Sequence, residues 1–108
     1  MDASLFLPGD NLDERVHKII TGVGIGPGPV QLLGVVPKYS TQSDDNAKVI
    51  AWLQQDGWIE DHADWADARA KRAFKLIISK PDTKPVKVIN AKDVCHAYCV
   101  ALIGARGH

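Results

Sequence analysis

Cysteine and histidine side chains near the C-terminal end are the first residues whose types suggest chemistry. Cys95, His96 and Cys99 lie within one short stretch, and thiolate and imidazole groups bind zinc or act together as nucleophile and base. Zinc usually needs four suitably spaced ligands, and the sequence contains neither C-x-x-C nor H-E-x-x-H. Adjacent helical residues point about 100° apart, so Cys95 and His96 do not form a catalytic pair. We therefore expect reduced, buried thiols, a histidine with a structural role, no metal and no cofactor.

A second candidate site is the polar run before a predicted helix, where Tyr39, Ser40 and Thr41 follow Lys38. Free amides and hydroxyls at the positive end of a helix suit a phosphate or a carboxylate. The same hydroxyls also serve as helix caps. Because the acidic pair at 44–45 already complements the helix dipole and would repel an anion, capping alone is the favoured interpretation.

Aromatic and basic residues come together in the middle of the chain. Trp65 lies among acidic residues, and Arg69 and Arg72 follow it. A nucleotide site needs an aromatic ring that stacks on the base and guanidinium groups that bind phosphate. Trp58 and Trp65 could also anchor a protein interface, and an oligomer interface formed by this aromatic and basic set is the favoured interpretation. Duplex nucleic acid is not an expected partner, because the pI near 6.9 lacks the basic footprint of such proteins.

Four glycines, Gly22, Gly24, Gly26 and Gly28, alternate with other residues after the first predicted helix. The backbone N–H groups of successive glycines can surround an anion. The run nevertheless lacks the G-x-G-x-x-G spacing and the Lys-Ser/Thr pair of phosphate-binding loops. A connector between elements is therefore favoured, and a loop that adapts to a ligand or partner is the alternative.

Length and composition indicate the domain organisation. The chain has 108 residues, of which 45% are hydrophobic, with 13 basic and 13 acidic side chains. This suffices for one core, and no apolar run approaches the about 20 residues of a membrane span. We expect a flexible leader over residues 1–10 and a single domain over 11–108. No basic region precedes the short apolar patch at 5–7, so we expect no secretory signal peptide and a cytoplasmic location.

The zero net charge hides a division along the chain. Residues 1–68 carry 4 basic and 11 acidic side chains, a net charge of −7, whereas residues 69–92 carry 8 basic and 1 acidic, a net charge of +7. In the simpler interpretation the two halves neutralise each other across the fold. The alternative is a bipolar surface that steers an anionic ligand or lets copies of the chain meet.

Hydrophobic spacing and turn residues predict an α+β fold in which a small antiparallel sheet packs with about three helices, in a sandwich-like α-β-α arrangement. Helices are expected from 12 to 21, from the polar run before 46 to 56, and to about 104 from a start at either Asn90 or Lys92-Asp93. Strands are expected from about 58, returning over 73–79 after a polar excursion at 66–70, and over 86–89. Residues 30–36 form a short strand or an extended segment. A helix is the alternative for 58–73, where alanine is frequent.

Two segments have the pattern of a known family. Residues 36–41 read VPKYST, an amphipathic helix follows over 46–53, and Gly57-Trp58 closes it. The last predicted helix, 94–102, contains alanine and cysteine. This order resembles the phage ABA-sandwich domain, over about residues 11–105. The resemblance implies the α+β fold and a source among phages and prophages, whose members of this family mostly lack an assigned activity.

The resemblance, and the absence of a catalytic signature, predict a non-enzymatic phage or prophage accessory protein that acts by binding. We expect a homo-oligomer and, in the more specific hypothesis, capture of a nucleotide-derived signal of the host's antiphage defence. The residues expected at that ligand are Tyr39, Ser40, Thr41, Trp65, Arg69 and Arg72. The alternative is a protein-interaction module that inhibits or redirects a host protein through Trp58, Trp65 and the bipolar charge surface.

Overall fold

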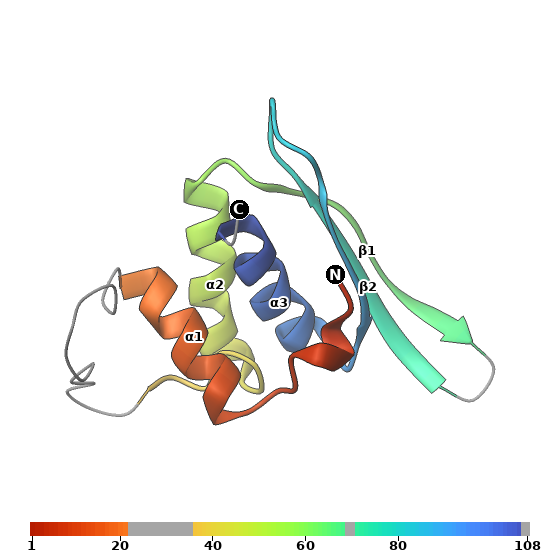
Figure 1. Cartoon of the computed structure of the whole chain (residues 1–108), viewed down its shortest axis with the longest axis horizontal. Helices are drawn as coiled ribbons and strands as arrows, with labels where there is room; N and C mark the ends of the chain where they lie inside the picture. Colours follow the sequence, from red (N-terminus) through yellow and green to blue (C-terminus); the bar gives the residue numbers. More distant parts are fainter. Residues whose placement is uncertain (22–35, 69–70, 107–108) are drawn as a thin grey trace.

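Along the described residues a short 3-10 helix and two α-helices come first, three strands follow, and a third α-helix comes last (Figure 1). The computed structural model describes residues 1–21, 36–68 and 71–106. The elements are the 3-10 helix η1 (Ala3–Leu5), α1 (Asp10–Thr21), α2 (Ser43–Gln55), β1 (Ile59–Ala68), β2 (Lys71–Ser79), β3 (Val86–Ala91) and α3 (Val94–Arg106). The predicted α+β fold is confirmed. The glycine series at 22–28 and nearly all of the expected segment 30–36 lie outside the described residues.

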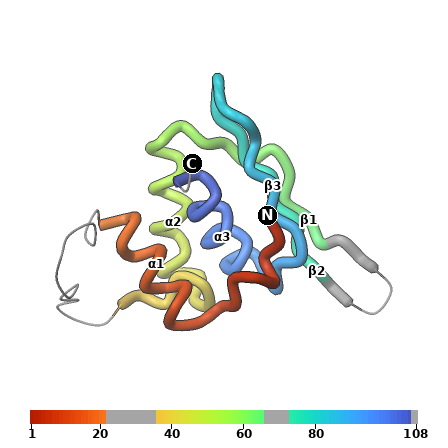
Figure 2. The backbone as a smooth tube through the Cα atoms, in the orientation of Figure 1, coloured from red at the N-terminus to blue at the C-terminus, as the bar shows by residue number. Residues whose placement is uncertain are grey.

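The sheet has the order β1-β2-β3, and both neighbouring pairs are antiparallel. The strand expected from Trp58 and its returning partner are thus confirmed, and both continue further toward their connection than expected. Successive strand residues face opposite sides, which leaves Phe74, Leu76 and Ile78 buried while Ile77 is half-buried. Figures 1 and 2 show α1, α2 and α3 together on one side of the sheet. The described part of the chain therefore has two layers.

Helix α3 lies at the centre of the core. Its residues from His96 to Gly104 are all buried, as expected of a helix that is covered on every side. The helix begins directly after Asp93, whose carboxylate accepts a hydrogen bond from the backbone N–H of His96 at 2.9 Å. Of the two predicted starts, Lys92-Asp93 is confirmed, whereas Asn90 lies in β3. A Cβ atom at Gly104 would collide with Sδ of Met1 and lie 2.9 Å from Cγ1 of Val86, so any larger residue here would force these neighbours to move.

The starts of α1 and α2 differ from the sequence-based expectation. Helix α1 begins at Asp10, before the expected residue 12, because the carbonyl of Gly9 already accepts a hydrogen bond from Asp13 N–H at 3.0 Å. Helix α2 begins after Gln42, whose side chain makes no capping hydrogen bond. Capping by a neighbouring hydroxyl is therefore not how α2 starts. Its end is as expected, since Gly57 adopts φ of +96°, a conformation that glycine takes without strain.

The first ten residues, expected to be a flexible leader, pack on the domain instead. Met1 lies beside the outer edge of β3, where its carbonyl accepts a hydrogen bond from Ile89 N–H at 2.9 Å. Ala3 is fully buried, and Phe6 is hydrogen-bonded to His96 of α3. The physical reason is that a strand edge offers unpaired backbone groups, which a short extended segment can satisfy.

Candidate functional site

Tyr39 and Ser40, two residues expected at a ligand, are buried and engaged within the protein. The hydroxyl of Tyr39 lies 2.8 Å from Nδ1 of His17, and the two rings stack. Burial raises the pKa of Tyr39 above its usual value. Ser40 donates its backbone N–H to the Asp13 carboxylate at 2.8 Å, and its hydroxyl accepts from Gly9 N–H at 3.0 Å. Both side chains therefore hold the segment before α2 against α1, which agrees with a structural role.

The other expected ligand residues lie in different places. Thr41 is exposed beside Ser40, whereas Trp65 is half-buried on β1 and packs edge-to-face on Phe74 with 5.3 Å between ring centroids. Arg72 lies on β2 opposite Asp67 in the register, and Arg69 is outside the described residues. Figure 1 shows the segment before α2 well apart from the far end of the β1–β2 hairpin. The structure thus brings Tyr39, Ser40 and Thr41 together, but not with Trp65.

His96 and Cys99 of α3 are buried in the core, whereas Cys95, which was expected to be buried, is half-buried. Nδ1 of His96 accepts a hydrogen bond from Lys92 N–H at 3.0 Å, and Nε2 lies 2.5 Å from the carbonyl oxygen of Phe6. Both thiols are free, and burial raises the pKa of Cys95 and of Cys99, which keeps them protonated. The described residues contain no group of three or more histidine, cysteine or acidic side chains placed to hold a metal ion.

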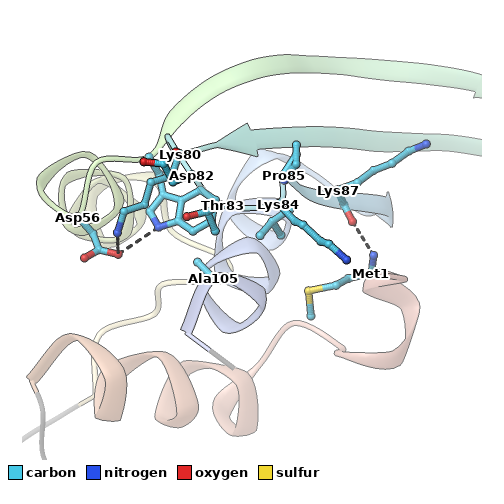
Figure 3. A pocket seen from close by; sticks show the side chains of 11 residues that line it. Met1, Asp56, Lys80, Asp82, Thr83, Lys84, Pro85, Lys87 and Ala105 are labelled. Atoms are coloured by element: carbon cyan, nitrogen blue, oxygen red, sulfur yellow. Dashed lines mark hydrogen bonds and ion pairs between the residues drawn. The ribbon is translucent and has the colours of Figure 1, made fainter. Parts of the chain in front are cut away.

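A cavity of about 710 Å³ lies where the β2–β3 turn faces the ends of α2 and α3 (Figure 3). Its size falls in the range of small-molecule sites, roughly 300 to 1,000 Å³. The apolar part of its lining includes Trp58, Val86 and Ala105, and the turn contributes Lys80, Thr83 and Lys84. The cavity therefore combines an apolar floor with polar and cationic side chains on one rim, which is the usual composition of a ligand site.

One corner of the cavity is held by the carboxylate of Asp56. Its Oδ2 accepts a hydrogen bond from the indole N–H of Trp58 at 3.1 Å and lies 3.5 Å from Nζ of Lys80. The same ammonium lies 5.9 Å from the centroid of the Trp58 ring. These contacts fix the indole and place one negative charge beside one positive charge, so this corner is preorganised and nearly neutral.

The opposite part of the rim is cationic. Figure 3 shows the Lys84 side chain reaching from the turn toward Met1, while the Lys87 side chain points away from the cavity. Within the part of the chain that the structure describes, the Lys84 ammonium has no carboxylate at ion-pair distance. The cavity lining has three lysines, Lys80, Lys84 and Lys87, against Asp56 and Asp82. An anion entering the cavity therefore meets an available ammonium group beside an apolar surface.

No pattern in the sequence identifies this cavity, although one of its signals is present. The basic stretch 69–92 contains the lysines of the rim, and Lys80 and Lys84 lie between the strands expected over 73–79 and 86–89. These lysines line a cavity because α3 and Met1 pack against the turn. No local pattern in the sequence reveals this packing. The carboxylate partner of Lys80 comes from the end of α2, far away in sequence.

Comparison of the chain with protein-family models, with curated proteins and with solved structures finds no match. The similarity to the phage ABA-sandwich domain stays an expectation that rests on the motifs alone. Among the described helices none is both long enough and apolar enough to cross a membrane.

Proposed function

We propose that the protein is a non-enzymatic binding protein that captures a small anion carrying an apolar or aromatic part in the cavity beside the β2–β3 turn. The observation that supports this is that Lys84, whose ammonium has no carboxylate partner among the described residues and reaches toward Met1 (Figure 3), lines the same cavity as the apolar residues Val86 and Ala105. A nucleotide-derived ligand has both features, a planar base and a phosphate. Its capture as a signal of host antiphage defence follows from the phage resemblance and belongs to the proposal.

Binding rather than catalysis is proposed because the candidate reactive groups are committed elsewhere. Both ring nitrogens of His96 face backbone groups, so no nitrogen is left to act as a base. Burial raises the pKa of the Cys99 thiol, which opposes formation of the nucleophilic thiolate. Stoichiometric capture needs no such group.

A thermal-shift screen against linear, cyclic and ADP-ribose-type nucleotides tests the proposal. A ligand present at about 100 times its dissociation constant adds about 2.7 kcal/mol to the free energy of unfolding, which raises the Tm of a domain of this size by on the order of ten degrees. We expect a selective shift with at least one anionic nucleotide. No shift with any member of the panel would contradict capture of a nucleotide.

Two sets of variants then locate the ligand. Lys84→Gln is expected to weaken binding about tenfold or more, because it removes a charged hydrogen-bond donor. Lys48→Gln, an exposed lysine of α2 that does not line the cavity, is the matched control. The double variant Arg69→Ala, Arg72→Ala tests the site predicted from sequence. If this double variant abolishes binding while Lys84→Gln does not, the cavity is the wrong site.

The protein-interaction module is a second candidate function, supported by the unequal charge of the two sequence segments. One of its expected anchors is not available, since Trp58 is only 4% exposed and its indole N–H is bound to Asp56. Trp65 is half-buried against Phe74. Formation of a stoichiometric complex with one host protein, unchanged by added nucleotide, would favour this candidate over small-anion capture.

A further inference from the structure

The two edges of the sheet differ in how their backbone groups are satisfied. The outer edge of β3 is covered by the N-terminal residues of the same chain: Ile89 N–H donates to the carbonyl of Met1, and the Met1 nitrogen donates to the carbonyl of Lys87 at 2.5 Å. Asp2 and Ile89 form a parallel bridge. Strand β1, by contrast, has a strand neighbour on one side only in the described structure.

Strand β1 is also strongly acidic. Its sequence, IEDHADWADA, contains four acidic residues and no lysine or arginine. Glu60, Asp61 and Asp64 are exposed, and within the described residues neither Asp61 nor Asp64 forms an ion pair. The adjacent strand β2 carries the basic residues, with Lys75 opposite Asp64 in the register. The negative charge of the sheet is therefore concentrated at the edge that has no neighbouring strand.

We propose that the outer edge of β1 docks an extended, lysine- or arginine-rich segment of a partner protein, which adds to the sheet as a further strand. Strand addition gives affinity through backbone hydrogen bonds, and side chains at alternate positions give specificity. Basic residues across from Asp64 and beside Asp61 would form the cross-strand charge pairs that stabilise neighbouring strands. This inference is independent of the cavity at the β2–β3 turn.

The same charges argue against a second copy of the chain as the occupant. Pairing of two β1 edges would place four acidic residues of one copy beside four of the other, and like charges on adjacent strands are destabilising. Charged edge residues are a known means by which proteins prevent edge-to-edge association. The acidic residues of β1 thus repel the same edge of a second copy and attract a basic strand. Repulsion and attraction both contribute to the specificity.

Contacts along the edge indicate what docking must displace. The carboxylate of Asp64 accepts a hydrogen bond from Trp65 N–H at 2.7 Å, and a register shift occurs between Glu60 and His62. A lysine or arginine of the incoming segment would draw the Asp64 carboxylate toward itself. Such a basic side chain offers the carboxylate a hydrogen bond in which donor and acceptor are both charged, in exchange for one in which only the acceptor is charged.

A synthetic peptide of ten residues, the length of β1, in which lysine alternates with valine, is the probe. The comparison peptides replace each lysine by glutamate, or each valine by proline to remove backbone N–H donors. Affinities are measured by isothermal titration calorimetry, and the site is located by amide hydrogen exchange. We expect binding of the lysine peptide alone, with increased protection confined to β1.

The double variant Asp61→Asn, Asp64→Asn is expected to weaken that binding about tenfold, because it removes two cross-strand charge pairs. The control double variant Glu14→Gln, Asp44→Asn removes the same net charge from exposed positions of α1 and α2. Equal weakening in both variants would show non-specific attraction and overturn the proposal. It would also be overturned if the proline peptide binds equally well, if protection appears elsewhere, or if wild-type protein forms a dimer that protects β1.

Discussion

Nε2 of His96 donates a hydrogen bond to the carbonyl oxygen of Phe6 at 2.5 Å, and this contact joins residues 90 positions apart. The tautomer follows from the other ring nitrogen, since Nδ1 accepts the backbone N–H of Lys92 at 3.0 Å and so carries no proton. One fully buried imidazole therefore connects the N-terminal segment to the start of α3. A histidine that sequence analysis considered for metal binding or catalysis acts as a structural connection.

Replacing His96 tests this connection. His96→Ala leaves the Phe6 carbonyl and the Lys92 N–H without their partner, and the expected loss in the free energy of unfolding is on the order of 3 kcal/mol. His96→Gln keeps an amide donor and acceptor and is expected to lose less. His62→Ala, at an exposed position of β1, should change stability by less than about 0.5 kcal/mol. Urea denaturation measures all three variants.

Hydrogen exchange separates local release from general loss of stability. If His96 holds the N-terminal segment, the amide of Ile89, which donates to Met1, exchanges faster in His96→Ala relative to amides in the centre of β2. A uniform increase across the whole sheet would instead indicate only a less stable fold.

The roles of Ser40 and Thr41 are separable by single substitutions. Ser40→Ala removes the acceptor of the Gly9 N–H and is expected to cost about 1 to 3 kcal/mol of stability. Thr41→Ala, at the exposed neighbour, is the matched control and should change stability by less than about 0.5 kcal/mol. If Ser40→Ala leaves the unfolding free energy unchanged and lowers nucleotide binding, the sequence-based assignment to the ligand is the better one.

Local signals in the sequence predicted the elements well where one residue determines a boundary. Asp93, one of the two predicted starts, caps α3; Gly57 ends α2; and the mostly apolar run of 73–79 lies in β2. The packing of residues 1–10 was not predicted, because it depends on the free edge of β3 and on the distant His96. The cavity was not predicted for the same reason, because its walls come from four separate parts of the chain.

The stability of the protein is expected to fall at alkaline pH. Burial, reinforced by the hydrogen bond to Glu60, raises the pKa of Tyr98 above its usual 10.0, and burial raises that of Cys99 above its usual 9.0. Between the unfolded and folded pKa values the unfolded chain has lost protons that the native protein retains. Each group therefore contributes fully to the free energy of unfolding below its unfolded pKa. Above that pH, each group lowers the free energy of unfolding by about 1.4 kcal/mol per pH unit.

Urea denaturation over a pH series starting near 8 checks this expectation, with the decrease beginning near the unfolded pKa of cysteine, about 9. Tyr98→Phe loses the 2.5 Å hydrogen bond to Glu60 and is less stable than wild type by about 1 kcal/mol at neutral pH. Its deficit should shrink above about pH 10, because phenylalanine cannot ionise. A deficit that stays constant over the whole series would show that Tyr98 titrates normally in the folded protein.

Asn46 has a structural role that its position in the sequence does not reveal. The sequence places it in the polar start of a helix, yet it is 2% exposed and its Nδ2 donates to the carbonyl oxygens of Tyr39 at 2.9 Å and Cys95 at 3.0 Å. This amide joins the segment before α2 to α3, and it also lies 3.7 Å from Sγ of Cys99. A polar residue on the buried face of a helix is satisfied only by partners that the tertiary structure supplies.

Substitution of Asn46 by aspartate should therefore be more damaging than substitution by alanine. Asn46→Ala leaves two buried carbonyl groups with fewer donors and is expected to cost about 2 to 3 kcal/mol. Asn46→Asp keeps the shape but places a carboxylate against those carbonyls, which adds the cost of a buried, unpaired charge at neutral pH. Its stability should recover partly as the pH falls and the carboxyl group takes up a proton. Lys48→Ala, exposed on the same helix, is the control, and equal stability of the alanine and aspartate variants at neutral pH would contradict the assigned contacts.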